Sequence, residues 1–144
     1  MITDQQIEDF QRDGAVLLRG NFTDWVDEMR AGVDRNIAEP GEYASENAVT
    51  EGRFFDDYCN WNRIPEFENL IRESPMAEIA AKAMQSETAQ IFHDHVLVKE
   101  PGTPKPTPWH QDIPYYFVKG EQTISFWMPL DSVKDASLRL IAGS

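Results

Sequence analysis

The stretch HVLVKEPGTPKPTPWHQD, residues 95–112, carries the strongest structural signal in the chain. Its first residues belong to an alternating segment, residues 88–100, in which apolar side chains recur at every second position. Successive side chains of a strand point to opposite faces, so this alternation predicts a β-strand. Four prolines follow between residues 101 and 108. Because proline cannot donate a backbone hydrogen bond, they predict a loop outside the sheet.

Four helices and one short strand are predicted before this stretch, and further strands are predicted after it. The predicted helices cover residues 3–14, 23–41, 64–74 and 74–86, and the other predicted strands cover residues 15–19, 123–131 and 137–141. Residues 42–49 are predicted to form a loop, and residues 52–61 to be partly extended. Helices followed by strands favour the α+β class. Long loops between the strands argue against a doubly wound sheet and favour a double-sheet jelly roll of the cupin kind.

Composition limits the functions open to the chain. Its 144 residues suffice for one domain with a core, but not for two ordinary domains. The net charge of −12 argues against a nucleic-acid partner and against an anionic membrane surface, because both favour clustered lysine and arginine. The single cysteine, Cys59, has no intramolecular partner, and neither a secretion signal nor a membrane helix is recognisable. We therefore expect a cytoplasmic protein that acts on a small molecule; the oligomeric state stays open.

His110 and Asp112 are a candidate metal-binding pair. Residues 109–112 are predicted to be extended. In an extended segment, residues i and i+2 point the same way with Cα atoms about 6.5 Å apart, so both side chains can reach one ion. An imidazole and a carboxylate are two of the three ligands in the facial triad of non-haem Fe(II) oxygenases. In a chain rich in aspartate, however, a His-X-Asp pair is weak evidence by itself.

Aromatic residues gather around this pair in the sequence. Those nearest to it are Trp109, Tyr115, Tyr116 and Phe117, and Trp127 follows on the next predicted strand. An apolar wall beside a few polar groups is typical of small-molecule sites. The surroundings therefore favour a site at the mouth of an apolar barrel, with Tyr115 and Tyr116 in the substrate pocket.

Three segments resemble the phytanoyl-CoA dioxygenase family of Fe(II)- and 2-oxoglutarate-dependent oxygenases. They are DGAVLLRGNF (13–22), HVLVKEPGTPKPTPWHQD (95–112) and ISFWMPLDSVKDASLRLIAGS (124–144), and they occur in that family's order and spacing. The resemblance spans nearly the whole chain. It implies a double-stranded β-helix, or jelly roll, with helices before it.

The resemblance also implies roles for individual residues. His110 and Asp112 match the proximal iron ligands of the family. The implied reaction hydroxylates an unactivated C–H bond of a small organic substrate with O2, and converts 2-oxoglutarate to succinate and CO2. Family members with a small residue at the position of Asp112 halogenate, so the carboxylate favours hydroxylation. His95, Thr107 and Trp127 match positions that border 2-oxoglutarate or line the site.

The same resemblance implies parts that these 144 residues do not contain. The family's third iron ligand is a distal histidine, and an arginine anchors 2-oxoglutarate; both lie beyond the position of Ser144. We therefore expect residues 1–144 to be the N-terminal part of one oxygenase domain, inactive alone. Residues 1–87 would form a helical flank, and residues 88–144 the jelly-roll strands that carry the metal motif. Alternatively, the 144 residues are the whole product, and activity needs another chain.

Two other interpretations stay open. His93 and His95 also lie two residues apart on a predicted strand, so they could join His110 and Asp112 in a four-ligand metal site of the cupin kind. In a different class, the chain is a non-catalytic, degenerate cupin-like module that binds a ligand, a metal or a partner. The sequence does not identify a substrate, although the net charge of −12 disfavours a CoA ester, whose phosphates favour a basic patch.

Overall fold

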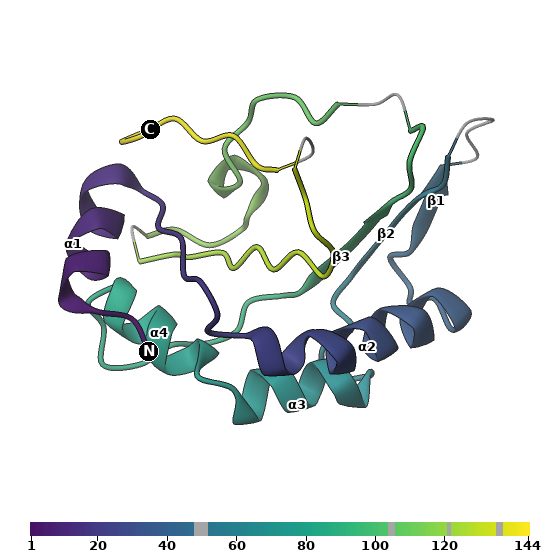
Figure 1. Cartoon of the computed structure of the whole chain (residues 1–144), viewed down its shortest axis with the longest axis horizontal. Coiled ribbons are helices and arrows are strands. Elements are labelled where there is room, and N and C mark those ends of the chain that lie inside the picture. The colour runs from purple at the N-terminus through teal and green to yellow at the C-terminus, as the bar shows by residue number, and fades with distance from the viewer. Residues whose placement is uncertain (48–51, 104–105, 121, 135–136) are drawn as a thin grey trace.

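A computed structural model describes residues 1–47, 52–103, 106–120, 122–134 and 137–144. Its helices are α1 (Asp4–Asp13), α2 (Val26–Ala38), α3 (Pro65–Glu73) and α4 (Met76–Ala83), with 3-10 turns η1 (Thr23–Trp25) and η2 (Ile113–Tyr115). The strands are β1 (Ser45–Asn47), β2 (Phe54–Tyr58) and β3 (His95–Lys99). The predicted α+β class is confirmed, and Figure 1 shows the C-terminal third, in green to yellow, on the side of the molecule opposite α2 and α3. The described helices have at most 13 residues, fewer than the roughly 20 that a membrane span requires.

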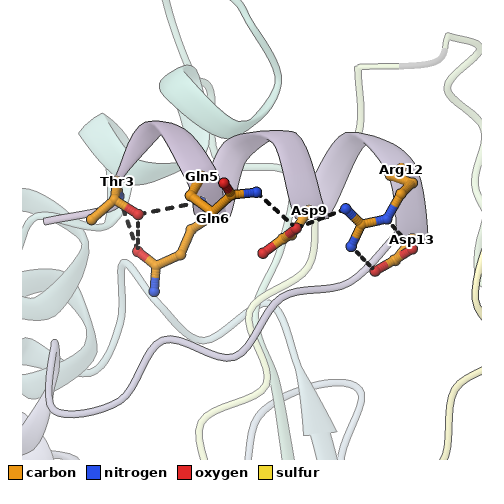
Figure 2. A network of polar contacts seen from close by, with 6 residues as sticks. All are labelled: Thr3, Gln5, Gln6, Asp9, Arg12 and Asp13. Atoms are coloured by element: carbon orange, nitrogen blue, oxygen red, sulfur yellow. Dashed lines mark hydrogen bonds and ion pairs between the residues drawn. The ribbon is translucent and has the colours of Figure 1, made fainter.

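Helix α1 begins and ends as its sequence predicts. The Thr3 hydroxyl accepts a hydrogen bond from the Gln6 N–H, and the Gln6 side chain accepts one from the Thr3 N–H (Figure 2). This capping box satisfies two donors at the start of the helix. Gly14 ends α1 with a φ of 78°, a left-handed conformation that costs glycine no steric energy.

Helices α2 and α3 pack together in the main core. Gly32 of α2 lies against the Phe67 ring of α3 so closely that a Cβ at this position would overlap the ring. At the surface, Arg35 Nη2 lies 2.8 Å from Glu66 Oε1 and links the same two helices. The core cluster comprises Met29, Phe55, Ile64, Phe67, Leu70 and Val96. It joins the helices to β2 and β3, and therefore fixes the position of the sheet.

The three strands form one antiparallel sheet in the order β1–β2–β3. Phe55 pairs with Val98, and Tyr58 pairs with His95. The strand predicted at residues 88–100 is confirmed only over β3. The loop predicted at residues 42–49 contains β1, which corrects that prediction; Ala48 and Val49 lie outside the described residues.

A buried carboxylate fixes the start of the turn after β2. Asp57 is fully buried, and its carboxylate accepts hydrogen bonds from the Asn36 amide and from the N–H groups of Gly41 and Tyr58. Burial raises the pKa of Asp57, but these donors outweigh burial, and the pKa lies below its ordinary value. The C-terminal end of α2 is thereby tied to β2.

A second carboxylate fixes the end of the same turn. Asp94 Oδ1 accepts hydrogen bonds from the N–H groups of Asn60 and Trp61, each at 2.8 Å. The Asp94 carbonyl accepts a further bond from Cys59 N–H, and Cys59 has a left-handed φ of 62°. Burial raises the pKa of Asp94 above its ordinary value despite these donors. Because Asp94 lies between the two histidines of this segment, the network also positions His93 and His95.

The double-stranded β-helix predicted for residues 88–144 is not seen in the described residues and stays a prediction. Beyond Lys99 the described residues contain no strand, and residues 15–19, 123–131 and 137–141 are not strands, which corrects those predictions. A strand is defined by its hydrogen-bonding neighbour as well as by its own side chains. The described residues supply these segments with no such neighbour.

Residues 124–130 nevertheless keep the side-chain alternation of a strand. Ile124 and Phe126 pack against the smaller core cluster of Ile2, Ile79 and Ala83, and Met128 and Leu130 pack against the main core. Trp127, between them, is 47% exposed. Figure 1 shows this yellow-green segment running as an extended chain toward β3. The predicted faces of the segment are therefore correct, although the predicted sheet pairing is not present.

Candidate metal centre

His110 and Asp112 are neighbours in the loop before η2. The distance from His110 Nε2 to Asp112 Oδ1 is 3.2 Å. On the other side of the imidazole, Nδ1 lies 2.8 Å from the carbonyl oxygen of Pro108. The two side chains are 39% and 51% exposed, so a ligand can reach them from solvent.

A bend, and not a strand, brings the pair together. Asp112 has helical φ and ψ angles of −74° and −38°, and its carbonyl accepts a hydrogen bond from Tyr115 N–H at 2.9 Å. Pro114 suits the start of this turn because its φ is fixed near −65°. The extended conformation predicted for residues 109–112 is thus wrong at Asp112, since η2 requires a helical conformation there.

The hydrogen bond to Pro108 decides which nitrogen of His110 faces Asp112. A carbonyl oxygen can only accept, so Nδ1 donates, and in the neutral ring Nε2 carries the lone pair. In the neutral ring this lone pair and the carboxylate oxygen, 3.2 Å apart, repel each other, so the close contact requires either a proton on Nε2 or a metal ion at the pair. Metal-binding histidines use this arrangement, with the outer nitrogen bonded to a carbonyl or carboxylate.

The spacing of the two donor atoms also fits one metal ion. Neighbouring ligands of an octahedral ion, each at about 2.1 Å from it, lie about 3 Å apart. The 3.2 Å between His110 Nε2 and Asp112 Oδ1 is close to this value. The pair could therefore hold two neighbouring positions of an Fe(II) ion.

Tyr116 links Asp112 to the aromatic side of the site. Its hydroxyl interacts with the side chains of Asp112 and Ser125. Burial, followed by the charge of Asp112, raises the pKa of Tyr116, so the hydroxyl keeps its proton and stays a donor. The Tyr116 ring also packs edge-on against His93, with 5.4 Å between the ring centroids, and against Phe92.

His95 lies on the sheet side of this group. Its ring stacks on Tyr58 with 3.8 Å between the centroids, and Nε2 is 3.8 Å from Asp56 Oδ2. Burial lowers the pKa of His95 below its ordinary value, and the attraction of Asp56 and Asp112 does not reverse this. His95 is therefore neutral at pH 7 and can accept or donate one hydrogen bond at each nitrogen according to its tautomer.

The structure does not bring together His93, His95, His110 and Asp112, the four ligands of the alternative metal site. Within the described ranges, no group of three or more His, Cys, Asp or Glu side chains is arranged to hold a metal ion. His93 packs instead among the rings of Phe92, Tyr58 and Tyr116. His110 and Asp112 lie together as a pair, and His93 and His95 belong to the neighbouring aromatic cluster.

The other predicted site residues lie at different distances from the pair. The Tyr115 ring is 6.3 Å from the His110 ring between centroids and is 77% exposed. Thr107 is exposed in the proline loop, and Trp127 projects from the segment 124–130. The described contacts join neither Thr107 nor Trp127 to His110 or Asp112.

A cavity of about 310 Å³ adjoins His110, and it contains a residue that the sequence reasoning missed. Its lining includes Trp109, His110 and Gln111 from one segment and Arg139, Leu140, Ile141 and Ser144 from the other. Arg139 is the one cationic side chain of this lining, and a guanidinium can bind a carboxylate with two hydrogen bonds. Only the tertiary structure brings Arg139 to His110, so no local sequence signal could have identified it.

Comparison with known proteins places the chain in a family. A family model described as phytanoyl-CoA dioxygenase (PhyH) matches residues 10–144. The chain therefore belongs to the phytanoyl-CoA dioxygenase family, a jelly-roll family whose members are typically Fe(II)- and 2-oxoglutarate-dependent oxygenases. Searches of curated proteins and of solved structures found no match.

Proposed function

We propose that this protein is an Fe(II)- and 2-oxoglutarate-dependent dioxygenase that hydroxylates a small organic substrate. The observation that carries the proposal is the pair of His110 and Asp112, whose donor atoms are 3.2 Å apart. The outer nitrogen of His110 is already bonded to a carbonyl, which leaves the inner one for a metal. Family membership over residues 10–144 supports the same reaction class.

In this proposal each residue near the pair has a defined task. His110 and Asp112 hold the iron ion, which supplies O2 reduction coupled to the decarboxylation of 2-oxoglutarate to succinate and CO2. Tyr116 orients the Asp112 carboxylate through its hydroxyl, while the Pro108 carbonyl orients the His110 ring. Tyr115 stands beside His110 and, together with Tyr116, forms part of the proposed substrate pocket.

The proposed contacts with 2-oxoglutarate have different support. His95 interacts electrostatically with Asp112, which supports a position at the edge of the cosubstrate site. Thr107 and Trp127 are proposed from the family resemblance alone. Arg139 is the cation beside His110, and it suits one carboxylate of the dianionic cosubstrate.

The third iron ligand is proposed to come from a residue outside these 144. The sequence has three histidines, and the described residues place neither of the other two in a group with the pair. The intact mass of the native polypeptide is then expected to exceed 16.5 kDa. The proposal includes a cytoplasmic location, which suits a chain with a single cysteine.

Succinate release tests the proposal. The native polypeptide, with Fe(II), ascorbate, O2 and 2-oxoglutarate, should release succinate, and His110→Ala or Asp112→Ala should reduce the rate at least 100-fold. Asp131→Ala is the matched control, because its side chain is also exposed and pairs with Arg30 away from the site. Unchanged succinate release in His110→Ala would exclude the proposed iron site.

The second candidate is a non-catalytic, cupin-like module. It is favoured by one observation, the lack of a third ligand beside the pair in the described part of the chain. A module of this kind would still bind a divalent metal through His110 and Asp112. It would release no succinate as the native polypeptide, and that outcome distinguishes it from the enzyme.

A further inference from the structure

A second hollow lies beside the aromatic cluster, away from the cavity at His110. It has a volume of about 370 Å³ and is lined by Tyr43, Tyr58, Cys59 and His93. This volume lies within the range of about 300–1,000 Å³ that is common for small-molecule sites. The lining comes from the turn before β1, the end of β2 with the turn after it, and the segment before β3. The hollow is therefore built by three parts of the fold.

We propose that this hollow binds the apolar body of a small organic cation. Two tyrosine rings and an imidazole make up most of its wall, and no lysine or arginine is among its lining residues. The faces of aromatic rings attract cations that lie within about 6 Å of the ring centre. An anion would find no lysine or arginine among the lining residues to pair with.

The charges around the hollow point to the same ligand class. After burial, the charges of Asp94 and Asp57 raise the pKa of the Cys59 thiol, which places the hollow in the negative potential of two carboxylates. The hydrogen bonds that Asp94 accepts from the turn after Cys59 fix its carboxylate beside this wall. A cation entering the hollow is attracted by this potential, and an anion is repelled.

The hollow is connected to the metal pair through a single side chain. The His93 ring contacts Tyr116 at 5.4 Å between centroids, and the Tyr116 hydroxyl interacts with Asp112. A substrate whose body lies in the hollow could thus reach past Tyr116 toward the iron. This assignment of the ligand as the substrate rests on the proposed function, whereas binding of the cation does not.

Cys59 provides the experiment. It is the one cysteine of the sequence and it is exposed, so its rate of alkylation by iodoacetamide reports on one site. The rate is measured on the metal-free chain with three probes of similar size at equal ionic strength: benzyltrimethylammonium, benzyl alcohol and benzoate. We expect benzyltrimethylammonium at saturation to slow the alkylation of Cys59 at least threefold. Benzyl alcohol should slow it by a smaller factor, and benzoate should not slow it measurably. Equal protection by benzoate, or no protection by any probe, overturns the proposal.

Two variants test whether the protection of Cys59 comes from binding in this hollow. Tyr43→Ala removes a lining ring that is 57% exposed, so the chain should fold and the protection by benzyltrimethylammonium should be lost. Leu17→Ala, which truncates an exposed apolar side chain outside the hollow, should keep it. Protection that persists in Tyr43→Ala overturns the assignment to this hollow. His110→Ala should leave protection unchanged, which separates this result from the fate of the iron site.

Discussion

Residues 1–98 and residues 99–144 differ in how they place their apolar side chains. All ten of the described buried hydrophobic residues lie at or before Val96, whereas ten of the fifteen exposed large hydrophobic residues follow Leu97. The charge divides in the same way: residues 1–98 contain 20 acidic and 8 basic residues, and residues 99–144 contain five of each. The first region thus has a core and an acidic surface, while the second has a neutral, apolar surface.

The accessible surface area of the whole chain is large for its mass. A folded monomer of 16.5 kDa ordinarily exposes about 7,500 Å². This chain exposes 10552 Å². The chain therefore exposes more surface than a folded monomer of its mass ordinarily does. The comparison teaches that the acidic region contains the buried core of the described residues, and that the neutral region carries the candidate site and most of the exposed large hydrophobic side chains.

Two phenylalanines should show the contrast most strongly. Phe55→Ala in β2 removes a side chain that is 2% exposed, and should lower the free energy of unfolding by about 3–5 kcal/mol. Phe117→Ala removes a side chain that is 91% exposed, and should change it by less than about 0.5 kcal/mol. Urea unfolding followed by circular dichroism measures both. Similar losses in the two variants would contradict the division into two regions.

Two aspartates should separate stability from metal binding. Asp57→Ala leaves one buried and two part-buried donors without this acceptor and should cost about 3 kcal/mol of unfolding free energy. Asp112→Ala, at an exposed position, should cost less than about 0.5 kcal/mol and yet abolish metal binding. Urea unfolding and titration with a divalent metal give the two readouts. A large stability loss in Asp112→Ala would mean that this carboxylate has a structural role.

Neighbouring residues of the segment 124–130 should differ by a smaller amount. Phe126 packs against the smaller core cluster and lies edge-on to Phe22 at 5.9 Å, so Phe126→Ala should cost about 2 kcal/mol. Trp127→Ala, on the exposed face, should cost less than about 1 kcal/mol. Thermal unfolding of both variants at one protein concentration makes the comparison. A larger loss of stability in Trp127→Ala than in Phe126→Ala would mean that Trp127, and not Phe126, faces the core.

The pH dependence of stability should give the smallest effect. The lowered pKa of Asp57 means that its contribution is present above the ordinary pKa of an aspartate and is lost as the pH falls through the lowered value. The raised pKa of Asp94 has the opposite sign: stability falls as the pH rises from the ordinary value through the raised one. Unfolding free energies between pH 2 and pH 8 measure both. Asp57→Asn should remove the loss of unfolding free energy at acidic pH. Asp94→Asn should remove the loss of unfolding free energy as the pH rises above about 4.

Local signals predicted local structure. The cap at Thr3 and the end at Gly14 define α1 through residues within one turn of each other. The alternation before the proline loop predicted β3, because the same residues face Phe55 and the core. By contrast, β1 is a short polar segment whose strand character comes from its pairing with β2, so its own residues give no signal.

The candidate site likewise combines features that the sequence predicts with features that it does not predict. The types and spacing of His110 and Asp112 predicted that they meet, although the bend at η2 was not predicted from a pattern read as extended. The contacts of Tyr116 with His93 and Ser125 and the position of Arg139 beside His110 depend on contacts between different segments. Such contacts have no periodicity in the sequence, so residue patterns alone could not predict them.

The imidazole resonances of the three histidines test the central claim most directly. Zn(II), a diamagnetic substitute for Fe(II), is added to the chain while NMR follows His93, His95 and His110. We expect His110 to shift first and furthest, Asp112→Asn to weaken binding at least tenfold, and Asp131→Asn to leave it unchanged. A simultaneous shift of His93, His95 and His110, or no shift of His110, would contradict the two-residue iron site.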